Sequence, residues 1–362
     1  MAAGVTDRLW EVADIVALVD AAEAKPAKRG AYRKREAAAE GSIPSVNYDV
    51  GPAFTVAHGR FPLRFARTDL LEIAFIEEGP VEGWPVILAH GFPFDVHAYD
   101  EVVPQLVRKG ARVIVPYLRG FGPTRFLSAT TMRSGQQAAL GRDMIDLLDA
   151  LGIETAILAG YDWGGLSSCV ASALWPERVT GLVSYAGYDI WDKKRARHAY
   201  EPALEHVQWY QHLFQIERGR ECLALYRREL CRMLWEQWSP SWKFDEATFQ
   251  RTAISFDNPD FVDVVIHCYR FGFGTAEGDP ALAPLERRLD ERPPISVPTV
   301  TLDGTQDPLK PGGTADHAPL FSGRHEHRVV ECGHNMPLEA PDAFSAAILT
   351  IREWTSATPN SN

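Results

Sequence analysis

Short apolar runs rich in β-branched residues alternate with helix-like segments through the middle of this chain. Four such runs are "PVILAHG" (85–91), "ARVIVPYL" (111–118), "TAILAGY" (155–161) and "VTGLVSYAGY" (179–188). Runs that are almost continuously apolar are typical of parallel strands that are covered on both faces. The segment 134–152 has helical apolar spacing and ends in Gly152, a common capping residue. Strands and helices that alternate in this way predict an α/β fold with a doubly wound, mostly parallel sheet.

A helical insert interrupts this pattern. Helical spacing dominates from Ile190 to Arg292, and five of the ten Trp residues fall there. Strand-like runs resume with "SVPTVTLDG" and "EHRVVECG", and a last helix-like segment follows them. We therefore predict a core made of residues 51–189 and 293–362, interrupted by a helical cap over residues 190–292.

An N-terminal extension, residues 1–50, precedes the core. It has helical apolar spacing from Leu9 to Val19, followed by six basic residues between Lys25 and Arg35. We expect a docking helix and a solvated basic linker; an arm that binds nucleic acid or a protein partner is the alternative. Whether the extension contributes to a homo-oligomer is left open by the sequence.

Composition limits the compartment and the kinds of partner. The net charge of -11 argues against a general nucleic-acid-binding surface. The five cysteines are scattered and odd in number, as expected for reduced thiols. The chain shows no secretory signal, and no apolar stretch approaches the ~20 residues that span a bilayer. We expect a cytoplasmic protein that acts on neither a membrane nor nucleic acid.

The stretch "LAGYDWGG" has the pattern Gly-x-Asp-x-Gly, centred on Asp162, between a strand-like run and a helix-like one. Glycines on both sides permit a strained turn that lifts the central side chain out at the end of the strand. Asp162 is therefore a candidate nucleophile. The alternative is an ordinary Asp N-cap on the helix that follows.

Other polar residues also follow predicted strands. Asp307 lies in a turn after one strand, and His334 lies in the loop after the next. Nucleophile, acid and His in this chain order form a catalytic triad in many hydrolases. Asp303, at the same strand end as Asp307, is the competing acid. The loop "HGFP" ends another strand and can present backbone N–H groups to an anion, and we expect its Phe92–Pro93 peptide to be cis.

The motifs "HGFP", "LRGFG", "GYDWGG", "GTQDP" and "CGHNMP" together resemble those of the α/β-hydrolase superfamily. Within it the chain is similar to the branch of epoxide hydrolases and haloalkane and haloacetate dehalogenases, whose nucleophile is Asp. The resemblance covers about residues 53–354. It implies an α/β-hydrolase fold with a helical cap. The chain departs from the usual pattern at Tyr161, where His is common, and at Tyr117, where Asp is common.

A carboxylate nucleophile suits attack on saturated carbon. It opens a strained ring or displaces a halide and leaves an alkyl ester on the enzyme. His334, oriented by Asp307, would then activate water to cleave that ester at Asp162. The backbone N–H groups of Phe92 and Trp163 would stabilise the resulting oxyanion.

The leaving group distinguishes the reactions. An epoxide oxygen must be protonated as the ring opens, and Tyr210 and Tyr269 lie in contexts that resemble the cap motifs carrying the two tyrosines of epoxide hydrolases. Either Tyr alone is more often a core residue. Tyr200 and Tyr226 are weaker candidates. The residues expected to contact substrate are Phe92, Trp163, Trp209 and His212.

Two alternatives to an epoxide hydrolase stay open. One is a dehalogenase that uses the same triad on an organohalide, although the chain lacks the Arg that follows the nucleophile in haloacetate dehalogenases. The other is a hydrolase fold with a silent site that serves as a binding protein. No cofactor is needed for the proposed chemistry. No metal site is expected either, because the histidines lack ligand spacing, and "RHEHR" is interpreted as an exposed turn.

Overall fold

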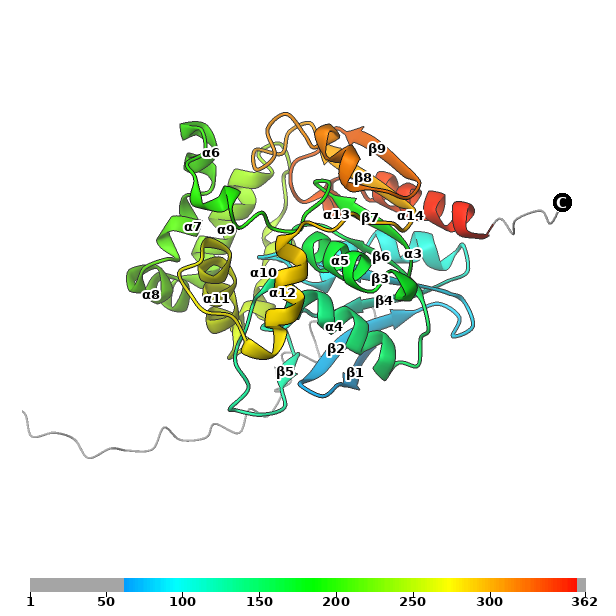
Figure 1. The fold of residues 1–362 in the computed structure, drawn as a ribbon, viewed down its shortest axis with the longest axis horizontal. Coiled ribbons are helices and arrows are strands. Elements are labelled where there is room, and N and C mark those ends of the chain that lie inside the picture. The colour runs from blue at the N-terminus through cyan, green and yellow to red at the C-terminus, as the bar shows by residue number, and fades with distance from the viewer. Residues whose placement is uncertain (1–61, 357–362) are drawn as a thin grey trace, which may run out of the picture. The chain divides into compact units, whose positions relative to one another are not determined.

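The computed structural model describes residues 62–356, and within them nine strands form one sheet (Figure 1). The predicted N-terminal helix and basic linker lie outside the described residues. The strands are β1 (Leu63–Arg67), β2 (Leu71–Glu78), β3 (Trp84–Ala89), β4 (Ala111–Pro116), β5 (Arg125–Phe126), β6 (Ala156–Gly160), β7 (Val179–Tyr185), β8 (Thr299–Gly304) and β9 (His325–Val330). Their order is β1-β2-β4-β3-β6-β7-β8-β9, with β5 paired to β2.

The strands from β4 to β9 in this order pair in parallel, whereas β1, β2 and β5 form an antiparallel edge. Every residue of β6 is buried, as expected for a central strand covered on both faces. The predicted doubly wound, mostly parallel sheet is confirmed. In such a sheet the carboxyl ends of the strands lie at one edge, where ligands bind.

Helices cover both faces of the sheet. The core helices are α3 (Val102–Val107), α4 (Gln137–Ala150), α5 (Trp163–Leu174), α13 (Met336–Glu339) and α14 (Pro341–Ser356). Helices α4 and α5 pack together on one face, and α3 and α14 pack together on the other (Figure 1). Helix α4 ends as expected, with Gly152 at a positive φ of 64°.

The insert between β7 and β8 is helical, as the sequence predicts. Its helices are α6 (Pro202–Val207), α7 (Trp209–Leu213), α8 (Glu217–Leu225), α9 (Arg227–Trp238), α10 (Glu246–Ala253), α11 (Phe261–Phe273) and α12 (Ala283–Asp290). Helix α12 contacts α4 and α5, so the last helix of the proposed cap packs on the core (Figure 1). The boundaries of the cap at residues 190 and 292 remain a proposal.

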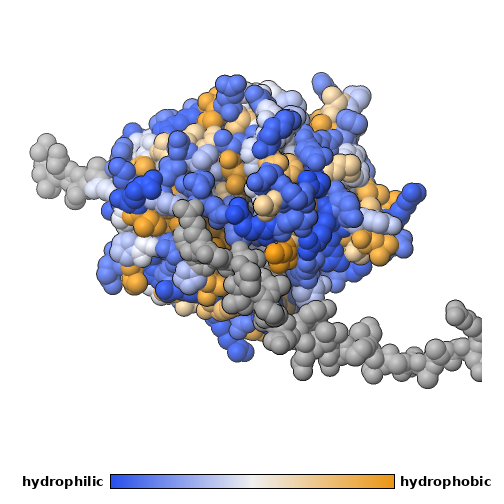
Figure 2. All heavy atoms as spheres, turned by 180° about the vertical axis from the view of Figure 1, so that it is seen from behind, coloured by the Kyte–Doolittle hydropathy of each residue, from blue (hydrophilic) through white to orange (hydrophobic). Residues whose placement is uncertain are grey.

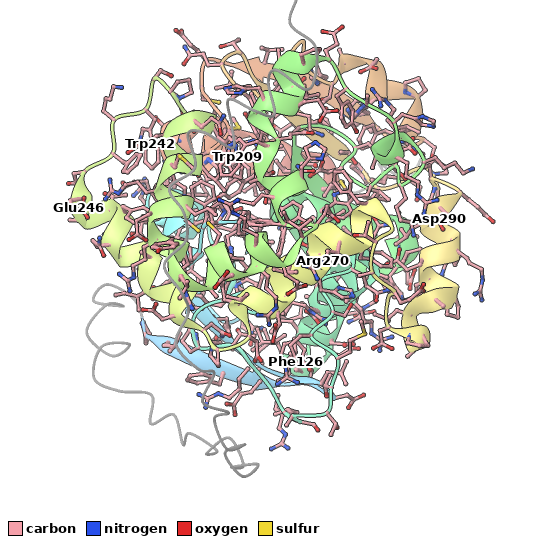
Figure 3. All side chains as sticks on the ribbon, turned by 90° about the vertical axis from the view of Figure 1, so that its left-hand side faces the viewer. Phe126, Trp209, Trp242, Glu246, Arg270 and Asp290 are labelled. Carbon is pink, nitrogen blue, oxygen red and sulfur yellow. The ribbon has the colours of Figure 1, made fainter. Side chains whose placement is uncertain are left out.

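Aromatic side chains fill the space between the insert and the core, and Figure 3 shows how densely side chains occupy it. Trp235 of α9 stacks on Phe94 of the core with ring centroids 4.6 Å apart, and its indole donates to the Pro93 carbonyl at 2.9 Å. The surface in Figure 2 is mainly hydrophilic, with apolar residues scattered over it. None of the described helices is long and apolar enough to cross a membrane.

Candidate active site

Asp162 sits in the turn between β6 and α5 with an unusual backbone, at φ 52° and ψ -126°. Its Oδ1 atom accepts hydrogen bonds from the backbone N–H groups of Phe92 and Trp163, both at 2.7 Å. An ordinary N-cap residue has extended dihedrals and accepts from the second or third N–H of its helix. Asp162 instead has a positive φ and accepts from the first N–H and from a distant loop. The geometry is therefore not that of a simple cap, and strain of this kind concentrates at functional sites.

Two glycines make this turn sterically possible. A Cβ atom at Gly164 would lie 1.8 Å from the Ala89 carbonyl oxygen, so only glycine allows α5 to begin so close to the end of β3. A Cβ atom at Gly91 would lie 2.5 Å from the Cβ of Asp162. The "HGFP" loop can therefore pass directly beside the Asp162 side chain.

The loop beside Asp162 is held by a neutral histidine. The Phe92–Pro93 peptide is cis, as predicted. Leu118 donates its N–H to His90 Nε2 at 3.1 Å, so Nδ1 carries the proton and donates to the Gly91 carbonyl at 2.9 Å. Burial lowers the pKa of His90 to about 4, which keeps the ring neutral. His90 thus ties the loop to the "LRGFG" segment and helps to aim the Phe92 N–H at Asp162.

His334 lies between two carboxylates. Its Nδ1 is 2.8 Å from Asp307 Oδ2, and its Nε2 is 3.4 Å from Asp162 Oδ2. The second oxygen of Asp307 accepts from the Leu309 N–H at 2.8 Å. The structure thus brings Asp162, Asp307 and His334 together in the arrangement that the chain order predicts.

Asp303, the competing acid, has a different place. It accepts from the Thr314 N–H at 2.5 Å and from the Thr314 hydroxyl at 2.7 Å, and it pairs with His327 at 3.3 Å. Asp303 therefore anchors the far end of the loop that carries Asp307. His325 and His327 lie in β9 with their rings against Thr301, so the interpretation of "RHEHR" as an exposed turn is wrong.

The His334 loop is fixed by both the core and the insert. The Tyr185 hydroxyl donates to the Gly333 carbonyl at 2.6 Å, and the His334 N–H donates to the Trp238 carbonyl at 3.0 Å. Glu339 accepts from the Gly333 N–H at 2.8 Å. These bonds hold the imidazole in place before any ligand arrives, as a preorganised base requires.

The electrostatics of the site depend on the two carboxylates. Burial on its own lowers the pKa of His334, but Asp307 and Asp162 outweigh it and raise this pKa to about 10. Burial raises and the His334 charge lowers the pKa of Asp307, with a net lowering. The resting site therefore holds an imidazolium between two carboxylates at neutral pH.

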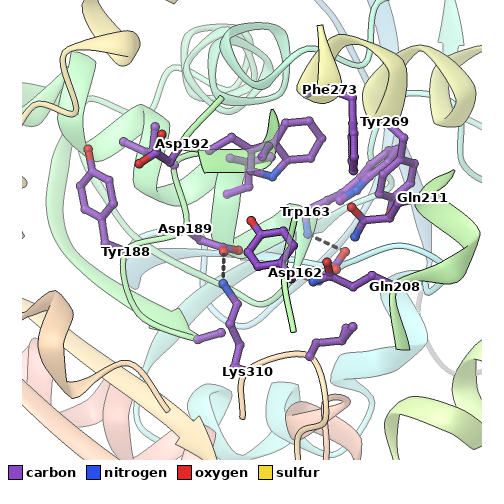
Figure 4. A pocket seen from close by; sticks show the side chains of 18 of the residues that line it. Asp162, Trp163, Tyr188, Asp189, Asp192, Gln208, Gln211, Tyr269, Phe273 and Lys310 are labelled. Atoms are coloured by element: carbon purple, nitrogen blue, oxygen red, sulfur yellow. Dashed lines mark hydrogen bonds and ion pairs between the residues drawn. The ribbon is translucent and has the colours of Figure 1, made fainter. Parts of the chain in front are cut away.

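A cavity of about 300 Å³ opens above Asp162 and lies between the core and the insert (Figure 4). Asp162, Trp163, His334, Tyr210 and Tyr269 all line it. A volume of this size is at the lower end of the range for small-molecule sites. The cavity therefore admits a small ligand to the carboxylate.

The two cap tyrosines meet in this cavity. Tyr210 of α7 and Tyr269 of α11 have perpendicular rings with centroids 5.3 Å apart, and their hydroxyl groups hydrogen-bond to each other. Gln211 Nε2 donates to the Tyr210 oxygen at 2.9 Å. Burial, followed by the charge of Asp162, raises the pKa of Tyr210, and burial is also the main cause of the raised pKa of Tyr269. Both phenols stay protonated at neutral pH and can act only as proton donors there.

Three expected substrate contacts are corrected. Trp209 and His212 are one helical turn apart on the face of α7 that is turned away from the cavity, whereas Gln208 and Gln211 share the face that lines it. The Trp209 indole donates to Gln237, and the His212 side chain is 53% exposed and pairs with Glu205. The Phe92 ring also does not line the cavity. It stacks on Trp163 at 5.6 Å, so only the backbone of Phe92 is directed at Asp162.

Several cavity residues were not singled out from the sequence. Asp189 follows β7 and Lys310 follows Asp307 by three residues, and the strand-end rule that found Asp162 and His334 applies to both. Tyr200, a weaker candidate, lines the cavity, whereas the Tyr226 side chain is exposed. Among the described residues, no group of three or more His, Cys, Asp and Glu side chains could hold a metal ion.

Comparison with known proteins agrees with this fold. The sequence pattern of the family described as alpha/beta hydrolase fold matches residues 85–341. A crystal structure from Klebsiella pneumoniae, described as a putative epoxide hydrolase, is 42% identical, with a TM-score of 0.79, and the match covers 80% of this chain and 97% of that one. The chain belongs to the α/β-hydrolase fold family.

Characterised relatives match over shorter segments. Epoxide hydrolase 3 of Siraitia grosvenorii is 33% identical over 114 residues, which is 32% of this chain and 34% of that protein. A haloalkane dehalogenase of Mycobacterium marinum is 31% identical over 125 residues, which is 33% of this chain and 40% of that protein. The chain thus matches less than half the length of these relatives.

Proposed function

We propose that this protein hydrolyses a small epoxide to a vicinal diol through an ester on Asp162. The observation that carries the proposal is the placement of the Tyr210 and Tyr269 hydroxyls in the same cavity as the Asp162 carboxylate. A halide leaves without a proton, whereas an epoxide oxygen needs a donor as it opens. The names of the Klebsiella and Siraitia proteins support the same reaction.

In the first step, Asp162 attacks a ring carbon. Its Oδ1 is held by two N–H groups, which leaves Oδ2 as the attacking oxygen. A bond forms between Oδ2 and carbon, the carbon–oxygen bond of the ring breaks, and the ring oxygen takes a proton from Tyr210 or Tyr269. The tyrosinate regains a proton from the His334 imidazolium through the solvent in the cavity. The product of this step is a hydroxyalkyl ester with a neutral imidazole beside it.

The second step follows from the loss of one charge. The Asp162 carboxylate helps to raise the pKa of His334, and esterification removes that charge. The imidazole can then accept a proton from water, which attacks the Asp162 carbonyl carbon. The oxyanion forms on Oδ1, where the N–H groups of Phe92 and Trp163 already point. Release of the diol returns the carboxylate, and the overall reaction consumes one epoxide and one water.

Trapping of the ester tests this proposal. In His334→Gln the water is not activated, so 1,2-epoxypentane should add its whole mass to the protein, detectable by intact-protein mass spectrometry. The matched control is the double variant Asp162→Asn with His334→Gln, which should gain no mass. Rapid diol formation by the wild-type protein, without an adduct in His334→Gln, would contradict a covalent route.

A dehalogenase is the second candidate, and one observation favours it. The buried indole Nε1 atom of Trp163 has no hydrogen-bond partner among the described residues, although Trp163 lines the cavity. An indole N–H beside the nucleophile can stabilise a departing halide. The comparison that separates the candidates is turnover of 1-bromobutane and fluoroacetate against that of 1,2-epoxypentane. Turnover of a halide but not of the epoxide would assign the protein to dehalogenation.

A further inference from the structure

An ion pair that the proposed mechanism does not use lines the same cavity. Lys310 Nζ lies 3.4 Å from Asp189 Oδ1 (Figure 4). Asp189 follows β7, and Lys310 belongs to the loop that carries Asp307. The side chains are only 15% and 35% exposed, respectively. Two charged groups were thus placed at the cavity wall on the same loops that position the triad.

This pair lies close to the reacting atoms. Asp189 Oδ2 is 3.4 Å from the position that a Cβ atom would have at Gly165, in the first turn of α5 after Asp162. Burial, and to a lesser degree the charge of Asp162, raise the pKa of Asp189 to about 6, while Lys310 opposes the rise. A substituent a few atoms from the attacked carbon can therefore reach the pair.

Both partners keep hydrogen-bonding capacity. An ammonium has three donors, and the only hydrogen bond given for Lys310 Nζ within the described part of the chain is this one, at 3.4 Å. Bonds between an ammonium and a carboxylate are usually 2.7–2.9 Å long. Asp189 Oδ2 has no hydrogen-bond donor recorded within residues 62–356. The pair therefore offers donors and an acceptor side by side in a mostly buried place.

The charge balance favours a neutral ligand group over an anion. Lys310 is already neutralised by Asp189, and the other cation at the cavity, Arg292, is paired with Asp192 at 2.7 Å. The nucleophile adds a further negative charge. A carboxylate on the substrate would find no cation without a partner, whereas a hydroxyl can accept from Lys310 and donate to Asp189 at once.

We propose that Lys310 and Asp189 form a subsite for a hydroxyl group, so that the preferred substrates are small epoxides with a neutral hydroxyl substituent. This inference rests on the proposed function for its substrate class. The subsite is a specificity element, and neither residue takes part in bond making or breaking.

Two epoxides of matched shape test the subsite. In 3,4-epoxybutan-1-ol a hydroxyl replaces the terminal methyl group of 1,2-epoxypentane. The measured quantity is the ratio of kcat/KM for the alcohol to that for the alkane. This ratio should fall by about 10-fold or more in Lys310→Met, because the hydroxyl loses a bond to a charged group. Asp189→Asn should lower it too, and turnover of 1,2-epoxypentane should change by less than about 3-fold in both variants.

Lys193→Met is the matched control. Lys193 also pairs with buried and surface carboxylates, Glu286 and Asp290, but does not line the cavity. Its ratio should equal that of the wild-type protein. An unchanged ratio in both Lys310→Met and Asp189→Asn would overturn the subsite. So would a wild-type preference for 3,4-epoxybutanoate over the alcohol, since that result would make the subsite an anion site.

Binding of the diol products separates this inference from the proposed reaction. Butane-1,2,4-triol and pentane-1,2-diol differ by the same hydroxyl, and ligand-observed NMR measures their affinities without turnover. Tighter binding of the triol by the wild-type protein, lost in Lys310→Met, would support the subsite even if neither epoxide reacted. Turnover of both epoxides with no effect of either variant on the ratio or on triol binding would leave the reaction standing and remove the subsite.

Discussion

At the scale of single residues, the protonation of His334 links the two proposed steps. Asp307 and Asp162 both contribute to its raised pKa of about 10. We expect Asp162→Asn to lower this pKa, because one of the two carboxylates is lost and the imidazole stays buried. Two-dimensional NMR of the imidazole over pH 5–11 measures the shift, with the exposed pair Glu205→Gln as control. A His334 pKa that stayed near 10 in Asp162→Asn would contradict the charge-loss argument.

The same residue gives the protein a pH-dependent stability. The pKa of His334 is raised above its unfolded value near 6.5, so protonation favours the folded state. This contribution is fully present below about pH 6.5 and is lost as the pH rises through about 10. Urea unfolding at pH 6 and pH 10 should therefore show a smaller loss of stability for His334→Gln than for the wild-type protein. An equal loss for both proteins would show that His334 is not the titrating group.

The two tyrosines are also tested at the residue scale. We expect Tyr210→Phe or Tyr269→Phe to slow ester formation from 1,2-epoxypentane, because the remaining hydroxyl can still protonate the ring oxygen. The double variant should be about 10²–10⁴-fold slower, the usual contribution of a general acid. Single-turnover mass spectrometry measures the rate, and 1-bromobutane is the control, since halide departure needs no proton. Undiminished ring opening in the double variant would exclude the tyrosines as acids.

At the scale of elements, the junction of β6 and α5 depends on one close approach. A Cβ atom at Gly164 would overlap the Ala89 carbonyl oxygen at 1.8 Å, whereas one at Gly165 would meet its nearest atoms at 3.4 Å, an ordinary contact. Gly164→Ala should therefore cost about 1–3 kcal/mol or more of unfolding free energy, and Gly165→Ala should cost less. Urea unfolding of both variants provides the test. Equal stability of the two would mean that α5 can shift away from β3 without penalty.

The sequence predicted the elements better than the directions of their side chains. The apolar runs that became β3, β4, β6 and β7 are buried on both faces, so their composition carries the signal directly. Helix α7 is five residues long, too short for its apolar spacing to define a face. That is why Trp209 and His212 were expected in the cavity, although Gln208 and Gln211 line it. The Lys310–Asp189 pair joins two distant loops, and no local pattern reports such a contact.

At the scale of the whole molecule, the insert is fastened to the core by a buried polar cluster around Asp95. Asp95 lies in the loop after β3, and its side chain accepts from Thr252 at 3.0 Å and from Ser255 at 2.6 Å, both in the insert. It also accepts from the His97 N–H at 3.0 Å. Because Asp95 is 1% exposed, removal of its carboxylate would leave three donors buried without their acceptor.

This fastening predicts that the core and the insert lose stability together when Asp95 is replaced. Asp95→Ala should lower the unfolding free energy by about 2–5 kcal/mol, since each stranded buried donor costs about 1–3 kcal/mol and relaxation recovers part of it. Amide exchange of α10 and η4 (Ile254–Asp257) should accelerate more than that of β6, because these segments hold the partners of Asp95. Asp257→Ala, which removes an exposed ion pair from the same insert, is the control and should change stability by less than about 1 kcal/mol. Acceleration of exchange in β6 equal to that in α10 would mean that the insert does not open separately, and that the cavity is exposed only when the whole molecule unfolds.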